Sequence, residues 1–287
     1  MRSENFRNRY FASLEAVLQH FVGNDTVRRA AIAVAGPITG DRVALLNIDW
    51  QFSQKAFAEA LGFERLIVLN DFEALAHALP VLGESDCHRV GGGDFEAGMP
   101  KAVVGPGSGL GVGSIVPAGD DWIAIGGEGG HVTLAPQTDT EARVIDDYRD
   151  ESGHCSAEKL LSGPGLTRIH SSLARHRGSE GPELAPDAIT AARAAGDALA
   201  VASCELFFAL LGAVAGNLAL TLGARGGVYI GGGIVPRMTD AIDTSAFRER
   251  FVGKGRYRGY LEKIATPVIM TDTPAFLGLR RVLAARN

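Results

Sequence analysis

The sequence predicts an α/β protein of two domains, with one sheet in each half of the chain. Short apolar runs rich in β-branched residues alternate with segments of helical periodicity in both halves. The chain of 287 residues is long for a single hydrophobic core and long enough for two. We expect a ligand cleft between the two domains, because interdomain clefts are common binding sites.

The composition is that of a soluble globular protein, with 46% hydrophobic and 21% charged residues. The net charge of −5 argues against a nucleic-acid partner, which would require a basic surface. The charged start of the chain lacks the apolar segment of a signal peptide. The three cysteines form no CxxC pair, which favours a reducing compartment. We therefore expect a cytoplasmic protein with no disulfide framework and no residue assigned as a metal ligand.

In the first half, residues 13–18 have the spacing of an amphipathic helix. The β-branched run 30–35 ends at Gly36-Pro37 and is typical of a buried strand, and residues 43–48 are expected to pair with it as a hairpin. Ser53 is placed to cap a helix that ends at Leu61, before Gly62. A third strand is expected at 66–69 and a further helix over 72–79.

In the second half, residues 101–104 and 111–116 are predicted as strands on either side of a glycine-rich loop. The apolar segment 201–222 predicts the longest helix, and we interpret it as buried rather than membrane-spanning because Asn217 interrupts its apolar run. Gly- and charge-rich segments at 85–100 and 177–186 are candidate linkers. Further strands are expected at 122–125, 227–230 and 268–270, and further helices from 141 onward and over 276–285.

Asn70-Asp71 lies between a predicted strand and a predicted helix. Aspartate is a preferred helix N-cap, and this role alone would explain Asp71. A carboxylate at the carboxyl end of a strand is equally well placed to accept a proton from an attacking hydroxyl. The two interpretations are compatible.

The loop from Gly105 to Gly111 is rich in glycine, which lets backbone N–H groups approach an anion closely. It indicates either a phosphate site or a plain hairpin turn. The sequence contains neither the GxGxxG spacing of dinucleotide oxidoreductases nor the GxxxxGK[ST] pattern of P-loop kinases. Both of those classes lose support.

The segment Gly127-Glu128-Gly129-Gly130-His131 places a carboxylate and an imidazole three residues apart among glycines. Their donors and acceptors suit the hydroxyls of a sugar, although a polar surface turn is the other interpretation. Glu158 falls in the first turn of a helix that Ser156 would cap, which by pattern alone indicates a structural residue. Gly231-Gly232-Gly233 ends a strand and is either a simple turn or a flat surface for a ring or ribose.

Taken in order, these motifs resemble bacterial glucokinases of the proteobacterial type. The resemblance covers nearly the whole chain. The segments that carry it are Ala35 to Gly40, Asn70 to Phe72, Gly105 to Gly111, Gly126 to His131, His154 to Gly165, Gly216 to Leu220 and Gly231 to Arg237.

The resemblance implies an actin-like (ribonuclease-H-like) ATPase fold with a cleft between two domains, a small one (1–80 plus 272–287) and a large one (81–271). It implies transfer of phosphate from ATP, with Mg²⁺, to the 6-hydroxyl of glucose, the entry step of glycolysis, and a homodimer. Asp71 matches the catalytic base. The sugar-binding positions are Asn70, Asp71, Glu128, His131 and Glu158. The nucleotide-binding positions are Gly105, Gly107, Ser108 and Gly109, then Gly231, Gly232 and Gly233.

One departure concerns the Asp-x-Gly-Gly-Thr phosphate motif with which the family begins. The sequence does not contain it. The sequence therefore leaves two functions open: a glucokinase, or a non-catalytic sugar-binding or regulatory protein. Donors other than ATP, such as ADP or polyphosphate, also stay open.

Overall fold

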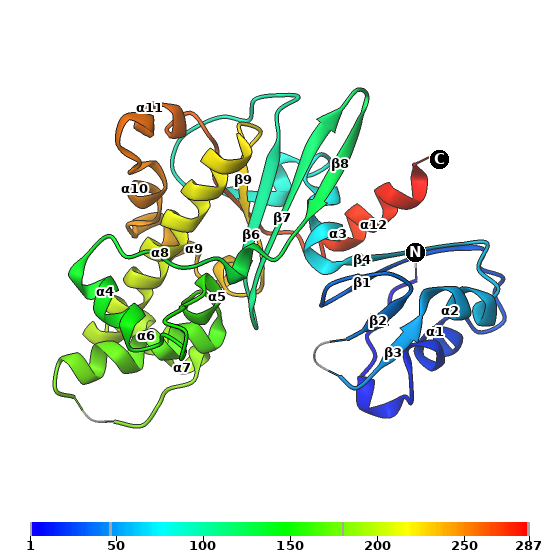
Figure 1. The fold of residues 1–287 in the computed structure, drawn as a ribbon, viewed down its shortest axis with the longest axis horizontal. Coiled ribbons are helices and arrows are strands. Elements are labelled where there is room, and N and C mark those ends of the chain that lie inside the picture. The colour runs from blue at the N-terminus through cyan, green and yellow to red at the C-terminus, as the bar shows by residue number, and fades with distance from the viewer. Residues whose placement is uncertain (1, 46–47, 180, 286–287) are drawn as a thin grey trace. The chain divides into compact units, whose positions relative to one another are not determined.

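Contacts between elements divide the chain into two units. The computed structural model describes residues 2–45, 48–179 and 181–285. Unit 1 is Met1–Ala78 with Thr273–Asn287, and unit 2 is Leu79–Asp272 (Figure 1). We predicted two domains, one of residues 1–80 plus 272–287 and one of residues 81–271. That these two parts of the chain are separate domains stays a prediction.

Unit 1 contains two small sheets. Strand β1 (Arg29–Val34) pairs in parallel with β4 (Arg65–Asn70), and β2 (Arg42–Ala44) pairs antiparallel with β3 (Gln51–Ser53). Both sheets and helix α2 contribute buried side chains to one hydrophobic cluster, Val34, Val43, Phe52, Phe57 and Val68. The remaining elements of unit 1 are η1 (Asn8–Tyr10), α1 (Leu14–Val22), α2 (Gln54–Leu61), α3 (Asp71–Ala78) and α12 (Ala275–Ala284).

Three of the predictions for this unit are wrong. Residues 43–48 do not pair with 30–35: β2 folds back on β3, and β1 takes β4 as its partner, because the helix α2 supplies the crossover that parallel pairing needs. Residues 46–47 of that predicted strand lie outside the described part. Strand β1 is also mostly half-buried, with only Val34 fully buried. The expectation of one sheet in the first half also fails, because β1 with β4 and β2 with β3 form two separate sheets.

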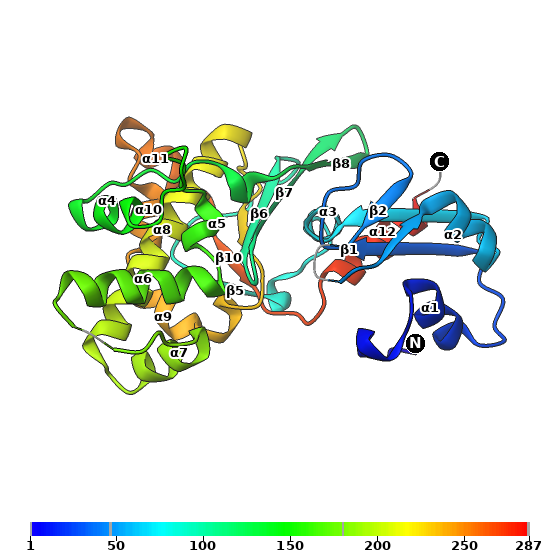
Figure 2. The same ribbon diagram turned by 60° about the horizontal axis from the view of Figure 1, so that its bottom comes forward.

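Serine side chains cap two helices of unit 1. The Ser53 hydroxyl accepts a hydrogen bond from Ala56 N at 3.1 Å, as predicted, and the Ser13 hydroxyl accepts one from Ala16 N at 3.2 Å, a cap that was not predicted. Figure 2 shows α12 beside α3, and the two helices approach closely because Gly278 lies on the Ala74 carbonyl, where a side chain has no room. This contact ties the end of the chain to α3.

Unit 2 is built on one six-stranded sheet in the order β5-β10-β9-β6-β7-β8. Strands β10, β9 and β6 are parallel to one another, whereas β5, β7 and β8 each run antiparallel to a neighbour. The strands are β5 (Cys87–Arg89), β6 (Lys101–Pro106), β7 (Leu110–Ala118), β8 (Asp121–Gly126), β9 (Val228–Ile230) and β10 (Pro267–Ile269). The segment 85–100, predicted as a linker, thus contributes a strand of this sheet. Strand β5 escaped prediction because it has three residues and little apolar character.

The helices of unit 2 pack around α8 (Ala198–Leu222), which is its central helix. The longer helices around it are α4 (Asp139–Asp146), α6 (Gly163–His176) and α7 (Pro186–Ala194). The shorter ones are α5 (Ala157–Leu160), α9 (Thr239–Thr244), α10 (Phe247–Val252) and α11 (Arg258–Leu261). Single 3-10 turns are η2 (Glu84–Asp86), η3 (Gly129–His131), η4 (Val235–Arg237) and η5 (Gly255–Tyr257).

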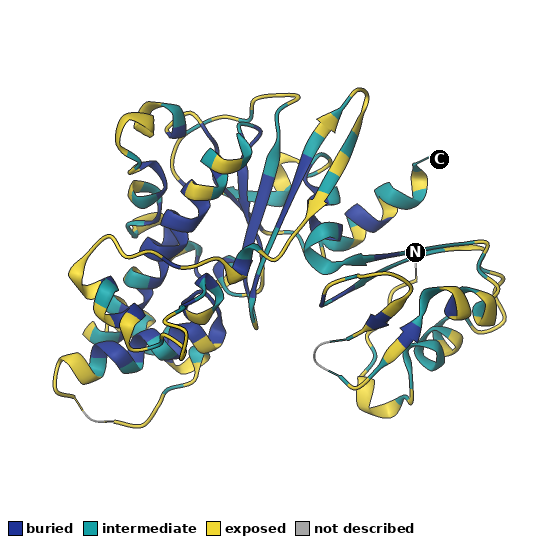
Figure 3. Cartoon of the chain, in the orientation of Figure 1, coloured by how far each residue is buried: buried dark blue, intermediate teal, exposed yellow. Residues whose placement is uncertain are grey.

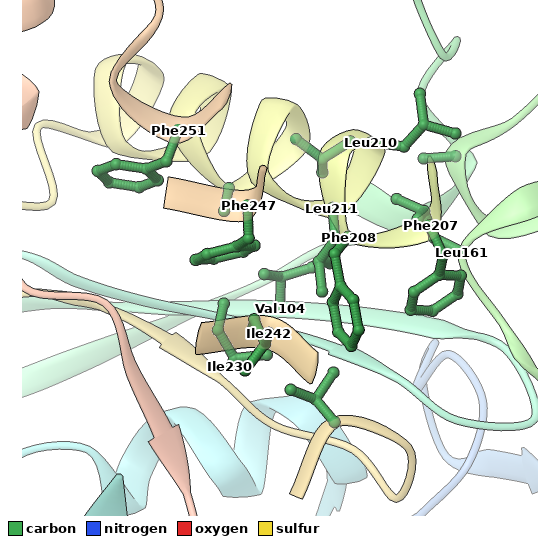
Figure 4. Packing of buried hydrophobic residues seen from close by; sticks show 14 of the residues in the cluster. Val104, Leu161, Phe207, Phe208, Leu210, Leu211, Ile230, Ile242, Phe247 and Phe251 are labelled. Atoms are coloured by element: carbon green, nitrogen blue, oxygen red, sulfur yellow. The ribbon is translucent and has the colours of Figure 1, made fainter. Parts of the chain in front are cut away.

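Helix α8 is long and apolar enough to cross a bilayer, and 67% of its most apolar window is buried inside the protein. The burial is visible as the dark middle of α8 in Figure 3. Phe208 of α8, Phe247 of α10 and Ile230 of β9 belong to one hydrophobic cluster (Figure 4). The predicted buried helix is therefore confirmed, and it forms the core of unit 2.

A buried ion pair joins two helices that flank this core. Glu141 of α4 is 1% exposed and accepts two hydrogen bonds from the guanidinium of Arg250 in α10, at 2.6 and 3.0 Å. Glu141 also accepts a hydrogen bond from Gln137 N at 2.6 Å. The pair fixes α4 against α10 by charge-assisted hydrogen bonds.

Candidate active site

The Asn70-Asp71 pair lies at the carboxyl end of β4, where the strand passes directly into α3. Asn70, rather than Asp71, caps the helix: its Oδ1 accepts hydrogen bonds from Phe72 N at 2.8 Å and Glu73 N at 3.3 Å. Its Nδ2 donates to Gly36 O at 3.1 Å, which ties the end of β4 to the end of β1. The N-cap interpretation of Asp71 is thus corrected in favour of the preceding residue.

Asp71 is the first residue of α3 and is half-buried. Its Oδ1 accepts a hydrogen bond from Phe72 N at 2.9 Å. The neighbouring carboxyl of Glu73 is also partly buried, and this burial raises its pKa, although a backbone hydrogen bond from Asn70 acts in the opposite direction. The hydrogen bond from Phe72 N holds the Asp71 carboxylate at the junction of β4 and α3, and a proton acceptor requires such a fixed position.

The predicted glycine loop is the turn between β6 and β7. Gly105 pairs with Gly111 in the ladder, and the last pair is Pro106 with Leu110. Gly107 N donates to Gly109 O at 2.8 Å, which closes the turn and leaves Ser108 exposed at its tip. Both interpretations of this loop, a hairpin turn and a phosphate cradle, are compatible with this geometry.

The Gly231-Gly232-Gly233 segment lies beside that turn. It follows β9, which runs parallel to β6, so both segments leave the sheet at the same edge. Gly231 N donates to Val104 O at 2.9 Å. Gly232 and Gly233 are exposed. Two of the predicted nucleotide segments are therefore brought together by the strand order.

Glu158 contacts the same turn from α5. Ser156 caps this helix by accepting from Lys159 N at 3.2 Å, as predicted. The Oε2 of Glu158 accepts a hydrogen bond from Leu110 N at 2.9 Å. The start of α6 adds a second contact, because Gly163 N donates to Gly107 O at 2.8 Å.

Glu128 precedes η3 and His131 is its last residue, and both are exposed. His131 N donates to Glu128 O at 3.0 Å, which closes the segment into one turn. Within the described ranges neither side chain has a hydrogen bond or ion pair to the protein, so both retain their full capacity for a ligand. Gly130 lies against the Leu110 carbonyl with no room for a side chain, and this contact anchors the turn to β7.

The structure thus groups the predicted site residues of unit 2 around one backbone segment, the β6–β7 turn, whereas Asn70 and Asp71 form a separate group in unit 1. Two contributors were not predicted, the N–H groups of Leu110 and Gly163. No side-chain signal marks them, because each acts through its backbone. No group of three or more His, Cys, Asp or Glu residues suited to a metal ion occurs in the part of the chain that the structure describes.

Comparison with solved structures defines the class of protein. A glucokinase from an Antarctic psychrotroph matches with a TM-score of 0.89 and 34% sequence identity, over 98% of this chain and 88% of the other. A ROK family glucokinase from Streptomyces griseus, in complex with glucose and AMPPNP, shares the fold with a TM-score of 0.62 and 19% identity, over 94% of this chain and 88% of the other. The chain has the fold of an actin-like sugar kinase, as predicted.

The family follows from the sequence comparison. The glucokinase family model matches residues 1–286. The glucokinase of Cupriavidus pinatubonensis is 46% identical over 281 residues, which is 95% of this chain and 82% of that protein. The chain belongs to the glucokinase family, and the resemblance inferred from its ordered motifs is confirmed.

Proposed function

We propose that this protein transfers the γ-phosphoryl group of ATP to the 6-hydroxyl of glucose, yielding glucose 6-phosphate and ADP at the entry of glycolysis. The observation that carries the proposal is the convergence of the predicted sugar segments and the predicted phosphate turn on the backbone of Leu110. Family membership over residues 1–286 supports the same reaction. The Streptomyces griseus relative binds glucose and an ATP analogue, which supports the two substrates.

Asp71 is the proposed base. Its carboxylate accepts the proton of the 6-hydroxyl as the oxygen attacks the γ-phosphorus in line, and the β–γ bridging oxygen leaves with ADP. Asn70 holds Asp71 by capping α3, and its second amide hydrogen is available to a sugar hydroxyl. An amide before the carboxylate can thus both cap the helix and bind a sugar hydroxyl.

Glu128, His131 and Glu158 are the proposed ligands of the other sugar hydroxyls. A carboxylate accepts hydrogen bonds and a neutral imidazole both donates and accepts, so the set discriminates between hydroxyl patterns. A site that hydrogen-bonds a hydroxyl rejects an analogue lacking it far more strongly than an apolar pocket would.

The β6–β7 turn with Gly105, Gly107, Ser108 and Gly109 is the proposed phosphate segment, and Gly231–Gly233 is the proposed adenosine segment. Mg²⁺ is held mainly by phosphate oxygens and water in such kinases and needs few protein ligands, so the scarcity of clustered ligands is compatible with it. When bound with ATP, this ion neutralises phosphate charge, and we assign no residue as its ligand.

Glucose-dependent release of ADP by the purified protein tests the proposal. We expect Asp71→Asn to lower kcat by about 10²- to 10⁴-fold, the usual contribution of a positioned base. The matched variant Asn217→Asp changes an exposed amide of α8 into a carboxylate that still accepts from Lys254 Nζ, and it should keep the wild-type rate. Glucose binding by calorimetry without ADP release would instead favour a non-catalytic sugar-binding protein.

The donor, location and assembly complete the proposal. We propose ATP as the donor, a cytoplasmic enzyme and a homodimer. Replacing ATP by ADP or polyphosphate in the same assay distinguishes the donors. Sedimentation of the purified protein measures the number of subunits.

A further inference from the structure

The peptide groups of Leu110 lie where three separate segments meet. Its N–H donates to Glu158 Oε2 from α5, and its carbonyl lies against Gly130 of the Glu128–His131 turn. The residue itself is the first of β7, directly after the glycine turn. The backbone of Leu110 therefore connects the proposed phosphate turn to both proposed sugar segments.

Contacts of its helix and of one side-chain oxygen hold Glu158 at this junction. Ser156 caps α5, and the Ser162 hydroxyl donates to Glu158 O at 2.9 Å, so the backbone at 158 is fixed on both sides. Gly109 packs directly against the carboxylate, leaving no space for a methyl group at that position. Among the described residues, Oε1 has no protein partner, whereas Oε2 is engaged by the turn.

We propose that Glu158 is a positioning residue for the β6–β7 turn, in addition to its proposed contact with sugar. This inference rests on the proposed function. The two carboxylate oxygens have different roles. Oε2 accepts the hydrogen bond from Leu110 N and so holds the turn in the conformation that binds the nucleotide phosphates. Oε1 accepts a hydrogen bond from a sugar hydroxyl. Because one rigid group serves both segments, the affinity for nucleotide depends on Glu158 even without sugar.

The distinguishing measurement is nucleotide affinity in the absence of glucose. Calorimetry with AMPPNP and Mg²⁺ in sugar-free buffer should show that Glu158→Ala weakens binding about tenfold, the effect expected for loss of a hydrogen bond to a charged group. Glu158→Gln keeps an oxygen that accepts from Leu110 N and should restore affinity to within about threefold of wild type. A residue that only contacts sugar would leave both values unchanged.

The matched control is His131→Gln. His131 contacts sugar in the same proposal, and among the described residues no hydrogen bond joins its side chain to Leu110, so this variant should raise the KM for glucose while nucleotide affinity stays at the wild-type value. Hydrogen exchange gives a direct readout, because the Leu110 amide should exchange faster in Glu158→Ala than in wild type.

Gly109→Ala covers the case in which Glu158→Ala fails to fold. A methyl group at 109 meets Glu158 Oε2, so this variant should displace the carboxylate and speed the exchange of the Leu110 amide, as Glu158→Ala does. Unchanged AMPPNP affinity in Glu158→Ala, or an unchanged exchange rate of the Leu110 amide in Gly109→Ala, with wild-type enzyme still releasing ADP in response to glucose, would overturn the inference alone. Absence of that wild-type activity would instead overturn the proposed function.

Discussion

The two halves of the proposed site are supported in different ways. In unit 2 the glycine turn extends from a six-stranded sheet that packs on the large α8 core. In unit 1 Asp71 follows a strand with one parallel partner, and most residues of β1 and β4 are only half-buried. The glycine turn of unit 2 is thus supported by a large sheet and its core. Asp71 has only a two-stranded sheet behind it, so its position depends on how α3 packs.

That packing comes from the other end of the chain. Helix α12 packs on both α3 and β1, and Gly278 lets it approach the backbone of α3. Asp71 is the first residue of α3, so a shift of this helix moves the proposed base directly. The comparison suggests that a residue distant in the sequence, Gly278, supports the helix that carries the proposed base.

The largest expected effect is in unit 2. Arg250→Met leaves the Glu141 carboxylate buried without its cation, which should lower the free energy of unfolding by about 3–5 kcal/mol. Chemical denaturation measures this loss. Hydrogen exchange should locate it in α4 and α10, with β1 and β4 unaffected.

The double variant Glu141→Leu/Arg250→Met serves as the control. It removes both charges, so most of the lost stability should return. A double variant as unstable as Arg250→Met would show that Arg250 contributes by packing rather than by neutralising Glu141.

The second effect is in unit 1. Gly278→Ala places a methyl group against the Ala74 carbonyl and should cost about 1–3 kcal/mol, the usual cost of overpacking. It should also lower kcat, because α3 carries Asp71, while AMPPNP affinity stays unchanged. Gly259→Ala is the matched control, since no atom lies within 4 Å of a methyl group there. Equal stability of the two variants would contradict the dependence of Asp71 on α12.

The third effect reports on unit 2 alone, because Cys87, Cys155 and Cys204 all belong to it. Burial raises the pKa of Cys87 and of Cys204 to about 11, from an ordinary value of 9.0. Fewer thiolates form at pH 8, so alkylation by iodoacetamide should be at least about tenfold slower in the native protein than in urea. Raising the pH toward 11 should speed the native reaction. Equal rates in native and unfolded protein would mean that the core of unit 2 does not protect these thiols, which would contradict the support that the comparison assigns to this unit.

The smallest effect concerns Glu73 beside the proposed base. Because burial raises its pKa, the stability that the protonated carboxyl contributes is complete below its ordinary value of 4.5 and is lost as the pH rises through the higher folded value. Glu73→Gln should therefore raise the free energy of unfolding at pH 7, by less than about 1 kcal/mol. Below pH 4 the variant and wild type should unfold alike, and a larger difference there would contradict this explanation.

Local signals predicted most elements, because caps and apolar periodicity act over a few residues. Ser13, Ser53 and Ser156 each cap the helix expected after them. Strand partners were harder, since an apolar run at 30–35 shows that a strand exists but not which strand binds it. The three-residue strand β5 has too few apolar positions to show a period of two.

The roles of the site residues remain predictions, and the structure adds where they lie. Glu128 and His131 share one turn, as their spacing of three residues suggested, whereas the contact of Glu158 with the glycine turn was not predicted. The role of Leu110 N–H was beyond prediction, because every residue except proline carries the same group. Asn70 was assigned to sugar alone, although its spacing before Phe72 and Glu73 is that of a capping residue.

The covering of α8 has a consequence for how this chain is made. The ribosome completes α8 at Leu222, but the helix α10 that packs on it ends only at Val252. During that interval α6 and α7 can already pack on α8, but the face that α10 covers is still exposed, and exposed apolar surface on a nascent chain favours aggregation. Chaperone demand should therefore peak in this window of translation, and chains released before residue 252 should be the ones that cells degrade or that precipitate.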